Sequence, residues 1–196
     1  VDVVVVPNAT INSFLVDTDK ITIGETATFS WDINNAESVT LNDETVNKTS
    51  GTKPVVFTTA GAFPYQLMTT SLSGVTNYSS TKTVNVYNVP IIANFTVNGQ
   101  AVVDVSPSAD LSFAWGTTYA SSLKLNNSVV TGTNTTLTAK STTGSTVYTL
   151  NAANEANRTV SKTVTVNVIG DPVIDPLTAP SPVSYTHLTL PTSDLV

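Results

Sequence analysis

The chain has 196 residues, a net charge of −6 and no cysteine, and only 11% of its residues are charged. Its eight Lys and Arg residues form no basic run, which argues against nucleic acid or an anionic membrane surface as partner. The lack of cysteine excludes disulfides and thiolate metal sites, and no apolar run is long enough for membrane insertion.

A strand–proline–strand pattern occurs three times along the chain. Pro7, Pro90 and Pro172 lie 83 and 82 residues apart, each between two apolar alternating segments. A repeat of this length predicts two domains, each large enough to bury a core of its own. The expected division is an N-terminal apolar strand at 1–8, one domain at 9–89, a second at 90–169, the start of a further repeat or extension at 170–182, and a segment of different origin at 183–196.

The first segment, residues 1–6, is too apolar for a free tail. We expect a β-strand whose sandwich lies elsewhere, because an unpaired apolar edge strand promotes aggregation. It is either the remnant of a preceding repeat or a strand that inserts into a neighbouring molecule, as in strand addition during pilus assembly. The residues of this assembly strand are Val1, Val3, Val4, Val5 and Val6.

Alternating apolar and polar residues predict β-strands through both domains, and no sustained helical period is present. The clearest strand, Thr26 to Ile33, contains FSW, and the second domain repeats it as FAW. SVTLN recurs as SLKLN, PYQLMT as VYTLNA, and the closing segment 80–87 as 161–168. Inward parity predicts a core that contains Phe29, Trp31, Tyr65, Phe113, Trp115 and Tyr148.

About seven strands per repeat, with turn residues between them, predict an all-β protein: two tandem antiparallel β-sandwich domains in an elongated rod. The segments INSF, GETATFSW and SVTLN, and their copies IANF, ADLSFAW and SLKLN, resemble the immunoglobulin-like (Ig-like) repeats of bacterial and archaeal surface proteins and of phage tail proteins. The resemblance covers about residues 9–169 and implies the Ig-like fold. The cysteine pair of antibody domains is absent, so we expect Trp31 and Trp115 to fill its place.

The last segment differs in character from the repeats. Val183 to Thr192, VSYTHLTLPT, resembles the translation of an adapter used in transposase-based DNA sequencing. We therefore expect an artefact in a gene assembled from environmental DNA. The alternative is a genuine strand, since Val183, Tyr185 and His187 alternate with smaller polar residues.

Few residues could carry chemistry. His187, the only histidine, lies in that last segment, so catalytic triads and His-ligated metals are not expected. The pairs Asp17/Asp19 and Asp43/Glu44 fall in predicted turns, where aspartate commonly bonds its own backbone. Calcium between the domains is an alternative, but no calcium-binding loop motif is present. We expect no enzyme activity, no metal and no cofactor.

Sequons of the form N-x-[ST] are the remaining motif, and most fall at predicted turns or on solvent-facing positions. A chain this rich in Asn, Ser and Thr contains several by chance, so the alternative is that none is modified. The N-glycosylation candidates are Asn8, Asn47, Asn77, Asn94, Asn126, Asn134 and Asn157.

The expected function is that of a non-enzymatic, extracellular structural glycoprotein at the cell surface. It would be a subunit of a filament or pilus, or the stalk of an adhesin, with copies of itself or adjoining Ig-like repeats as partners. The alternative is a carbohydrate- or receptor-binding module of an adhesin or phage tail, with a host or surface glycan as partner. That alternative requires an exposed aromatic or acidic cluster, which the sequence does not reveal.

Overall fold

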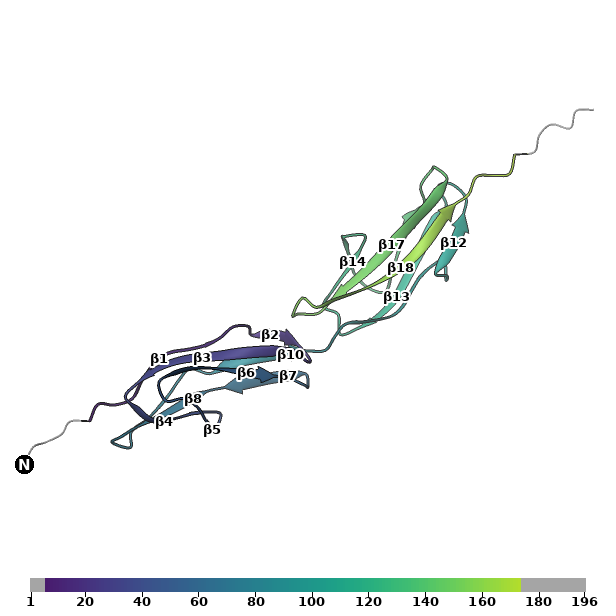
Figure 1. The fold of residues 1–196 in the computed structure, drawn as a ribbon. Coiled ribbons are helices and arrows are strands. Elements are labelled where there is room, and N and C mark those ends of the chain that lie inside the picture. The colour runs from purple at the N-terminus through teal and green to yellow at the C-terminus, as the bar shows by residue number, and fades with distance from the viewer. Residues whose placement is uncertain (1–5, 174–196) are drawn as a thin grey trace, which may run out of the picture.

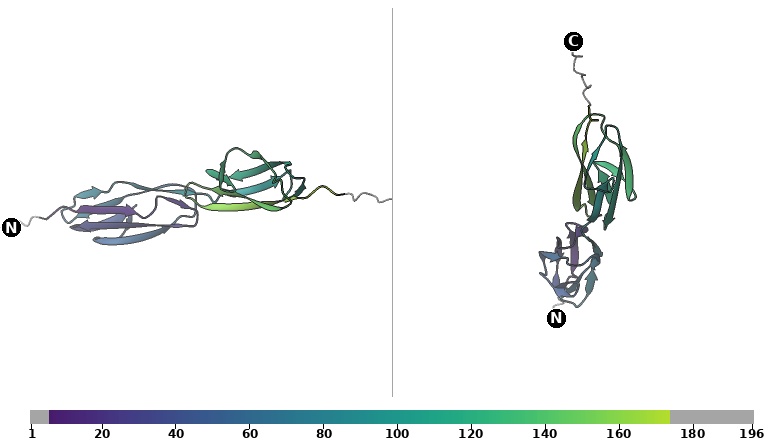
Figure 2. Two further views of the ribbon diagram at one scale, coloured as in Figure 1. Left: turned by 90° about the horizontal axis from the view of Figure 1, so that it is seen from above. Right: turned by 90° about the vertical axis from the view of Figure 1, so that its right-hand side faces the viewer.

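The computed structural model describes residues 6–173, which form two β-sandwiches placed end to end (Figure 1). The views in Figure 2 show the same succession, with β1 at one end of the molecule and the exit of β18 at the other. No helix occurs among the described residues. The prediction of an all-β chain with tandem Ig-like sandwiches is confirmed.

The first sandwich is built from short strands that follow the predicted apolar alternation. They number ten in residues 6–89, more than expected, partly because two long strands are interrupted. They are β1 (Thr10–Val16), β2 (Lys20–Thr22), β3 (Thr26–Asn34), β4 (Ala36–Leu41), β5 (Glu44–Thr45), β6 (Ser50–Val56), β7 (Gly61–Tyr65), β8 (Leu67–Ser71), β9 (Thr76–Tyr78) and β10 (Lys82–Tyr87).

The second sandwich repeats this order with uninterrupted long strands. Its strands are β11 (Ile91–Val97), β12 (Val102–Val105), β13 (Asp110–Thr118), β14 (Ser122–Leu125), β15 (Ser128–Val130), β16 (Asn134–Thr138), β17 (Gly144–Ala153) and β18 (Thr159–Val168).

One sheet of each sandwich contains the first strand of its domain and has three strands, in the order β1-β3-β6 or β11-β13-β16. The facing sheet of the second sandwich has the order β12-β18-β17-β14-β15. Its edge strand β12 pairs with β18 in parallel, as β2 does with β10 in the first sandwich. All other pairings between the described strands are antiparallel, and both copies carry the same register shift in their first strand.

In the first sandwich the facing sheet is divided into β2-β10-β7 and β5-β4-β8-β9. Met68 pairs with Tyr78, but Tyr65 pairs with Lys82, so the closing strand has one residue more than its partner between these pairs. This β-bulge makes Val84 the counterpart of Val166. The closing segments 80–87 and 161–168 therefore correspond one position away from the expected alignment, which places Val84 opposite Thr165.

Each sandwich encloses its own hydrophobic cluster with the same three aromatic rings. Phe14 stacks on Phe29 with ring centroids 5.9 Å apart, and Tyr65 lies 4.3 Å from Phe29. The second cluster places Phe95, Phe113 and Tyr148 likewise, at 6.1 and 4.8 Å. Of the six predicted core residues, five are buried, and Tyr65 is half-buried against its cluster. Burial raises the pKa of the Tyr65 hydroxyl.

The two tryptophans anchor a loop to each core. The Trp31 indole N–H donates a hydrogen bond to the Asn47 carbonyl, and the Trp115 indole N–H donates one to the Gly132 carbonyl, each at 3.0 Å. Both rings are nearly fully buried. Each tryptophan therefore joins the core of its sandwich to a neighbouring loop, in a fold without cysteine.

Candidate interdomain joint

The connection between the sandwiches is short. Strand β10 ends at Tyr87 and β11 begins at Ile91, which leaves Asn88, Val89 and Pro90 to link them. Pro90 is buried, and proline fixes its own backbone φ angle. A connection of this length brings the end of the first sandwich into direct contact with the β17–β18 turn of the second.

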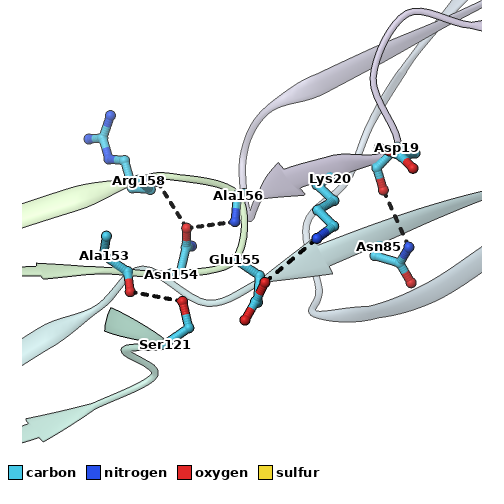
Figure 3. A network of polar contacts seen from close by, with 9 residues as sticks. All are labelled: Asp19, Lys20, Asn85, Ser121, Ala153, Asn154, Glu155, Ala156 and Arg158. Atoms are coloured by element: carbon cyan, nitrogen blue, oxygen red, sulfur yellow. Dashed lines mark hydrogen bonds and ion pairs between the residues drawn. The ribbon is translucent and has the colours of Figure 1, made fainter. Parts of the chain in front are cut away.

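Asn154 occupies the centre of this contact. It follows β17, and its Oδ1 accepts hydrogen bonds from the amides of Ala156 at 3.0 Å and Arg158 at 2.9 Å (Figure 3). Its Nδ2 crosses to the first domain, donating to the Asn88 carbonyl at 2.8 Å and the Thr22 hydroxyl at 3.3 Å. Asn154 is 4% exposed, so its amide group is removed from water with every bond satisfied by protein.

An ion pair lies beside this network. The Lys20 ammonium is 3.6 Å from the Glu155 carboxylate, and Figure 3 shows the two side chains meeting across the joint. About half of each side chain is exposed, so water and salt screen the pair. We therefore infer that Asn154 contributes more than this ion pair to fixing the orientation of the two domains.

A shallow groove of about 230 Å³ opens where the two sandwiches meet. Its walls come from the end of β10, including Val86 and Tyr87, and from Tyr119 and Ala120 of the second domain. Tyr119 has φ 60°, which turns the chain between β13 and β14. The groove offers mostly apolar contact, and its lining includes the exposed Glu155 and the engaged Asn154.

No cluster of possible metal ligands occurs at the joint or elsewhere in the described chain. Between residues 6 and 173, no three or more acidic or histidine side chains gather as metal ligands would. Asp17 instead accepts the Thr28 amide at 2.9 Å, and this hydrogen bond lowers the pKa of its carboxyl. In the same part of the chain, nothing has the form of a membrane-crossing helix.

The sequons occupy different environments. Asn8, Asn47, Asn94, Asn134 and Asn157 are exposed. Asn126 is exposed too, but its Oδ1 accepts the Thr149 amide at 2.8 Å.

Asn77 differs from these, because it is half-buried and its Nδ2 donates to the Ala9 carbonyl at 2.6 Å. Nδ2 is the atom that would carry a glycan. The structure thus separates Asn77, whose Nδ2 is engaged, from the six exposed candidates, and modification of any of the seven stays a prediction.

Most of the proposed assembly strand falls outside the described residues. Val1, Val3, Val4 and Val5 belong to this undescribed part, and so does the adapter-like segment at 183–196. Val6 is described and half-buried, just before the first sandwich. Strand exchange therefore remains a prediction.

Sequence reasoning missed Asn154, since it belongs to no sequon and to no aromatic pattern. One available signal was the match of VYTLNA with PYQLMT, which makes Asn154 the counterpart of Ser71 in the first domain. The backbone N–H of Asn154 donates a hydrogen bond to the Arg158 carbonyl, just as the backbone N–H of Ser71 donates one to the Val75 carbonyl. The two turns therefore match, and only the second has an amide side chain at this position.

No protein-family model and no curated protein sequence matches the chain. An I-band fragment of titin is similar over 84% of this chain and 66% of its own length, with 13% identity and a TM-score of 0.53. The chain thus spans slightly less than two thirds of that fragment.

Two further solved structures are similar. The D1-D2 fragment of Rst is similar over 84% of this chain and 100% of its own length, with 12% identity and a TM-score of 0.50. Fibronectin(III)-like modules of Clostridium thermocellum CbhA show 14% identity, cover 83% of this chain and 94% of their own, and have a TM-score of 0.45. At these identities the likeness to the titin and Rst fragments shows the Ig-like fold alone.

Proposed function

We propose that the chain is a non-enzymatic structural module of an extracellular surface rod, either a subunit of a filament or pilus or part of an adhesin stalk. The observation that carries this proposal is the joint at Asn154. A spacer must keep its two ends at a fixed distance and orientation. A short connection with a buried hydrogen-bonded contact restricts the relative motion of two domains.

The surfaces of the described residues support a structural role over catalysis. An enzyme requires titratable or nucleophilic groups held together in a cleft. The acidic side chains are dispersed: some lie in turns, others make isolated surface ion pairs, as Glu37 does with Lys48 at 3.8 Å, and Asp32 and Asp104 accept single hydrogen bonds from asparagines. Many of the other exposed residues are threonine, serine or asparagine, whose neutral polar side chains suit the surface of a spacer.

The stiffness of the rod is tested on the full chain by residual dipolar couplings and small-angle X-ray scattering. We expect one alignment tensor to describe both domains, and a scattering profile that changes little with salt, because the joint does not depend on its exposed ion pair. Separate tensors for the two domains would contradict a rigid spacer.

Assembly is proposed to use residues 1–6 as a strand that completes the sandwich of a neighbouring copy. Analytical ultracentrifugation and electron microscopy of the full chain should then reveal concentration-dependent head-to-tail oligomers. The matched control is the same chain without residues 1–6, which should remain monomeric. A full chain that stays monomeric at every concentration would remove strand exchange and leave the spacer role in place.

Surface exposure and glycosylation are tested on the natural protein. Antibody labelling of intact source cells should detect the chain at the surface. Glycopeptide mass spectrometry should find modification at exposed sequons such as Asn8, Asn94 and Asn134, and none at Asn77, whose Nδ2 is engaged. Unmodified peptides at all the exposed sites would remove the glycoprotein proposal.

A further inference from the structure

A groove of about 350 Å³ lies on the outer face of the first sandwich, next to the β-bulge. Thr40, Met68 and Tyr78 are paired directly across β4, β8 and β9, so their side chains share one face of the sheet. The neighbouring residues Leu41 and Leu67 point into the core. The groove is lined by Thr40, Asn42, Asp43, Gln66, Met68 and Tyr78.

The lining combines an aromatic wall with unused polar atoms. Tyr78 is 61% exposed. Gln66 donates through Nε2 to the Ser79 carbonyl, and this bond orients its amide group. Within the described residues, no hydrogen bond or ion pair engages the Asp43 carboxylate, the Gln66 Oε1, or the hydroxyls of Thr40 and Tyr78.

The backbone around the groove fixes these groups in place. Asn42 has φ 45°. Its side chain accepts a hydrogen bond from the backbone N–H of Gln66 at 2.9 Å and donates one to the Pro64 carbonyl at 2.8 Å. The bulge interrupts the sheet at Gln66, and bulges often redirect a side chain beside a binding site.

The second sandwich provides an internal comparison, because the same three-strand row is present without these side chains. Its row is Lys124, Asn151 and Ser161, and its sheet runs through without a break. The aromatic ring of Tyr78, the thioether of Met68 and the bulge thus occur together in the first domain, and none of them has a counterpart in the second.

We propose that this groove binds a neutral saccharide. A sugar ring presents C–H groups to the face of Tyr78, and its hydroxyls would donate to Asp43 and Gln66 and accept from Thr40 and Tyr78. No lysine or arginine lines the groove, so it lacks the cation that an anionic ligand requires. Its volume is near the lower limit for ligand pockets, which suits one or two sugar rings.

The test is a titration of the full chain, isotopically labelled, with neutral oligosaccharides built from glucose, galactose, mannose or N-acetylglucosamine. We expect at least one of them at millimolar concentration to shift the amide resonances of Thr40, Gln66, Met68 and Tyr78. Tyr78→Ala should weaken that binding by about tenfold, while Tyr78→Phe should retain most of it, because the ring supplies the contact.

The matched control is Ser161→Ala, which changes the equivalent position of the second domain and should leave the titration unaltered. The proposal is overturned if none of these sugars shifts the groove resonances, if the shifts fall on the second domain, or if Tyr78→Ala binds as well as wild type. The proposal does not depend on the spacer role: sugar binding can fail in a rigid rod, and a flexible joint can coexist with a working groove.

Discussion

At the scale of single residues, the absence of a side chain at Gly51 makes room for the Trp31 ring. The two residues are paired across β6 and β3. A Cβ atom at Gly51 would lie 2.7 Å from Cζ2 of the buried Trp31 ring, too close for any side chain. We expect Gly51→Ala to destabilise the first domain by about 1–3 kcal/mol, because the ring cannot move without disturbing the core.

Urea unfolding followed by amide resonances resolves the two domains and measures this change. Thr133→Ala is the control, since Thr133 lies beside Trp115 and its carbonyl accepts a hydrogen bond from the Trp115 backbone amide. That substitution should cost little, because it removes exposed atoms. An unchanged midpoint for Gly51→Ala would show that the Trp31 ring is not held in place.

Asp17 provides a second effect at this scale, through pH. Its hydrogen bond from the Thr28 amide lowers the pKa of the carboxyl below 3.8. The folded state therefore binds the proton less tightly than the unfolded state. The resulting stabilisation is present above the unfolded-state pKa and is lost as the pH falls through the folded-state pKa.

We expect Asp17→Asn to lower the urea midpoint of the first domain slightly at neutral pH and to match wild type in strong acid. Asp19→Asn changes the net charge equally, but no hydrogen bond to the Asp19 carboxylate occurs within residues 6–173. A deficit of the same size at all pH values would mean that the charge of Asp17 is not responsible.

At the scale of elements, an asparagine at the start of a tight turn joins neighbouring strands. Asn42 has φ 45° and makes two side-chain hydrogen bonds, one to Pro64 of β7 and one to Gln66, which links β7 and β8. Asn126 repeats the geometry with its bond to Thr149, and Asn98 does so with Ser112. Asparagine suits these positions because it tolerates a positive φ angle and bonds locally.

Two substitutions separate the two contributions of Asn42. Asn42→Gly keeps the positive φ angle without strain and loses the hydrogen bonds, whereas Asn42→Ala loses the bonds and adds backbone strain. We expect Asn42→Ala to cost about 1–2 kcal/mol and Asn42→Gly less, as measured by urea unfolding of the first domain. Equal losses would mean that strain contributes nothing at this turn.

Alternation predicted the strands because burial imposes a period of two on any half-buried sheet. The matching of FSW with FAW located Trp31 and Trp115 for this reason. The bulge near Ser79 left no such trace, since one inserted polar residue alters neither composition nor the pattern on either side. The groove beside it depends on Tyr78 and Met68, which become neighbours only through strand pairing.

The joint was beyond sequence reasoning for a related reason. Asn154 bonds residues that precede it by 66 and 132 positions, and no periodic pattern connects residues so far apart. Lys20 and Glu155 lie 135 positions apart in the sequence. Sequence identified the connection at Pro90, which is a local feature, but the contact that orients the domains is tertiary.

At the scale of the whole molecule, the outer ends of the rod do not copy this joint. Asp104 pairs with Asn167 in the second domain as Lys20 pairs with Asn85 in the first. Leu72 follows Ser71 where Glu155 follows Asn154, and it is 68% exposed. If two copies stacked end to end in the geometry of the internal joint, Asp104 of one copy would thus face Leu72 of the next, where the internal joint has Lys20 facing Glu155.

The contact between copies that strand exchange requires should therefore differ from the internal joint. We expect Leu72→Ser to leave the assembly of the full chain unchanged in analytical ultracentrifugation, and deletion of residues 1–6 to abolish it. The reverse result, with assembly lost in Leu72→Ser and kept after the deletion, would favour stacking of the domain ends.

Asn154→Asp isolates the contribution of the joint to the stiffness of the rod. The aspartate keeps an oxygen that accepts from Ala156 and Arg158, so the turn retains its hydrogen bonds. It loses the donor to the Asn88 carbonyl and the Thr22 hydroxyl, and it places a carboxylate beside the carbonyl. The orientation of the two domains should therefore loosen while both domains stay folded.

Residual dipolar couplings should then require separate alignment tensors at neutral pH. Acid should partly restore a single tensor, because a protonated carboxyl can again donate to the Asn88 carbonyl. Ser71→Ala is the matched control, since Ser71 holds the corresponding turn through its bonds to Val75, and its side-chain hydrogen bonds within residues 6–173 all stay inside the first domain. If Asn154→Asp keeps one tensor at neutral pH, the short connection at Pro90 alone would be enough to fix the orientation.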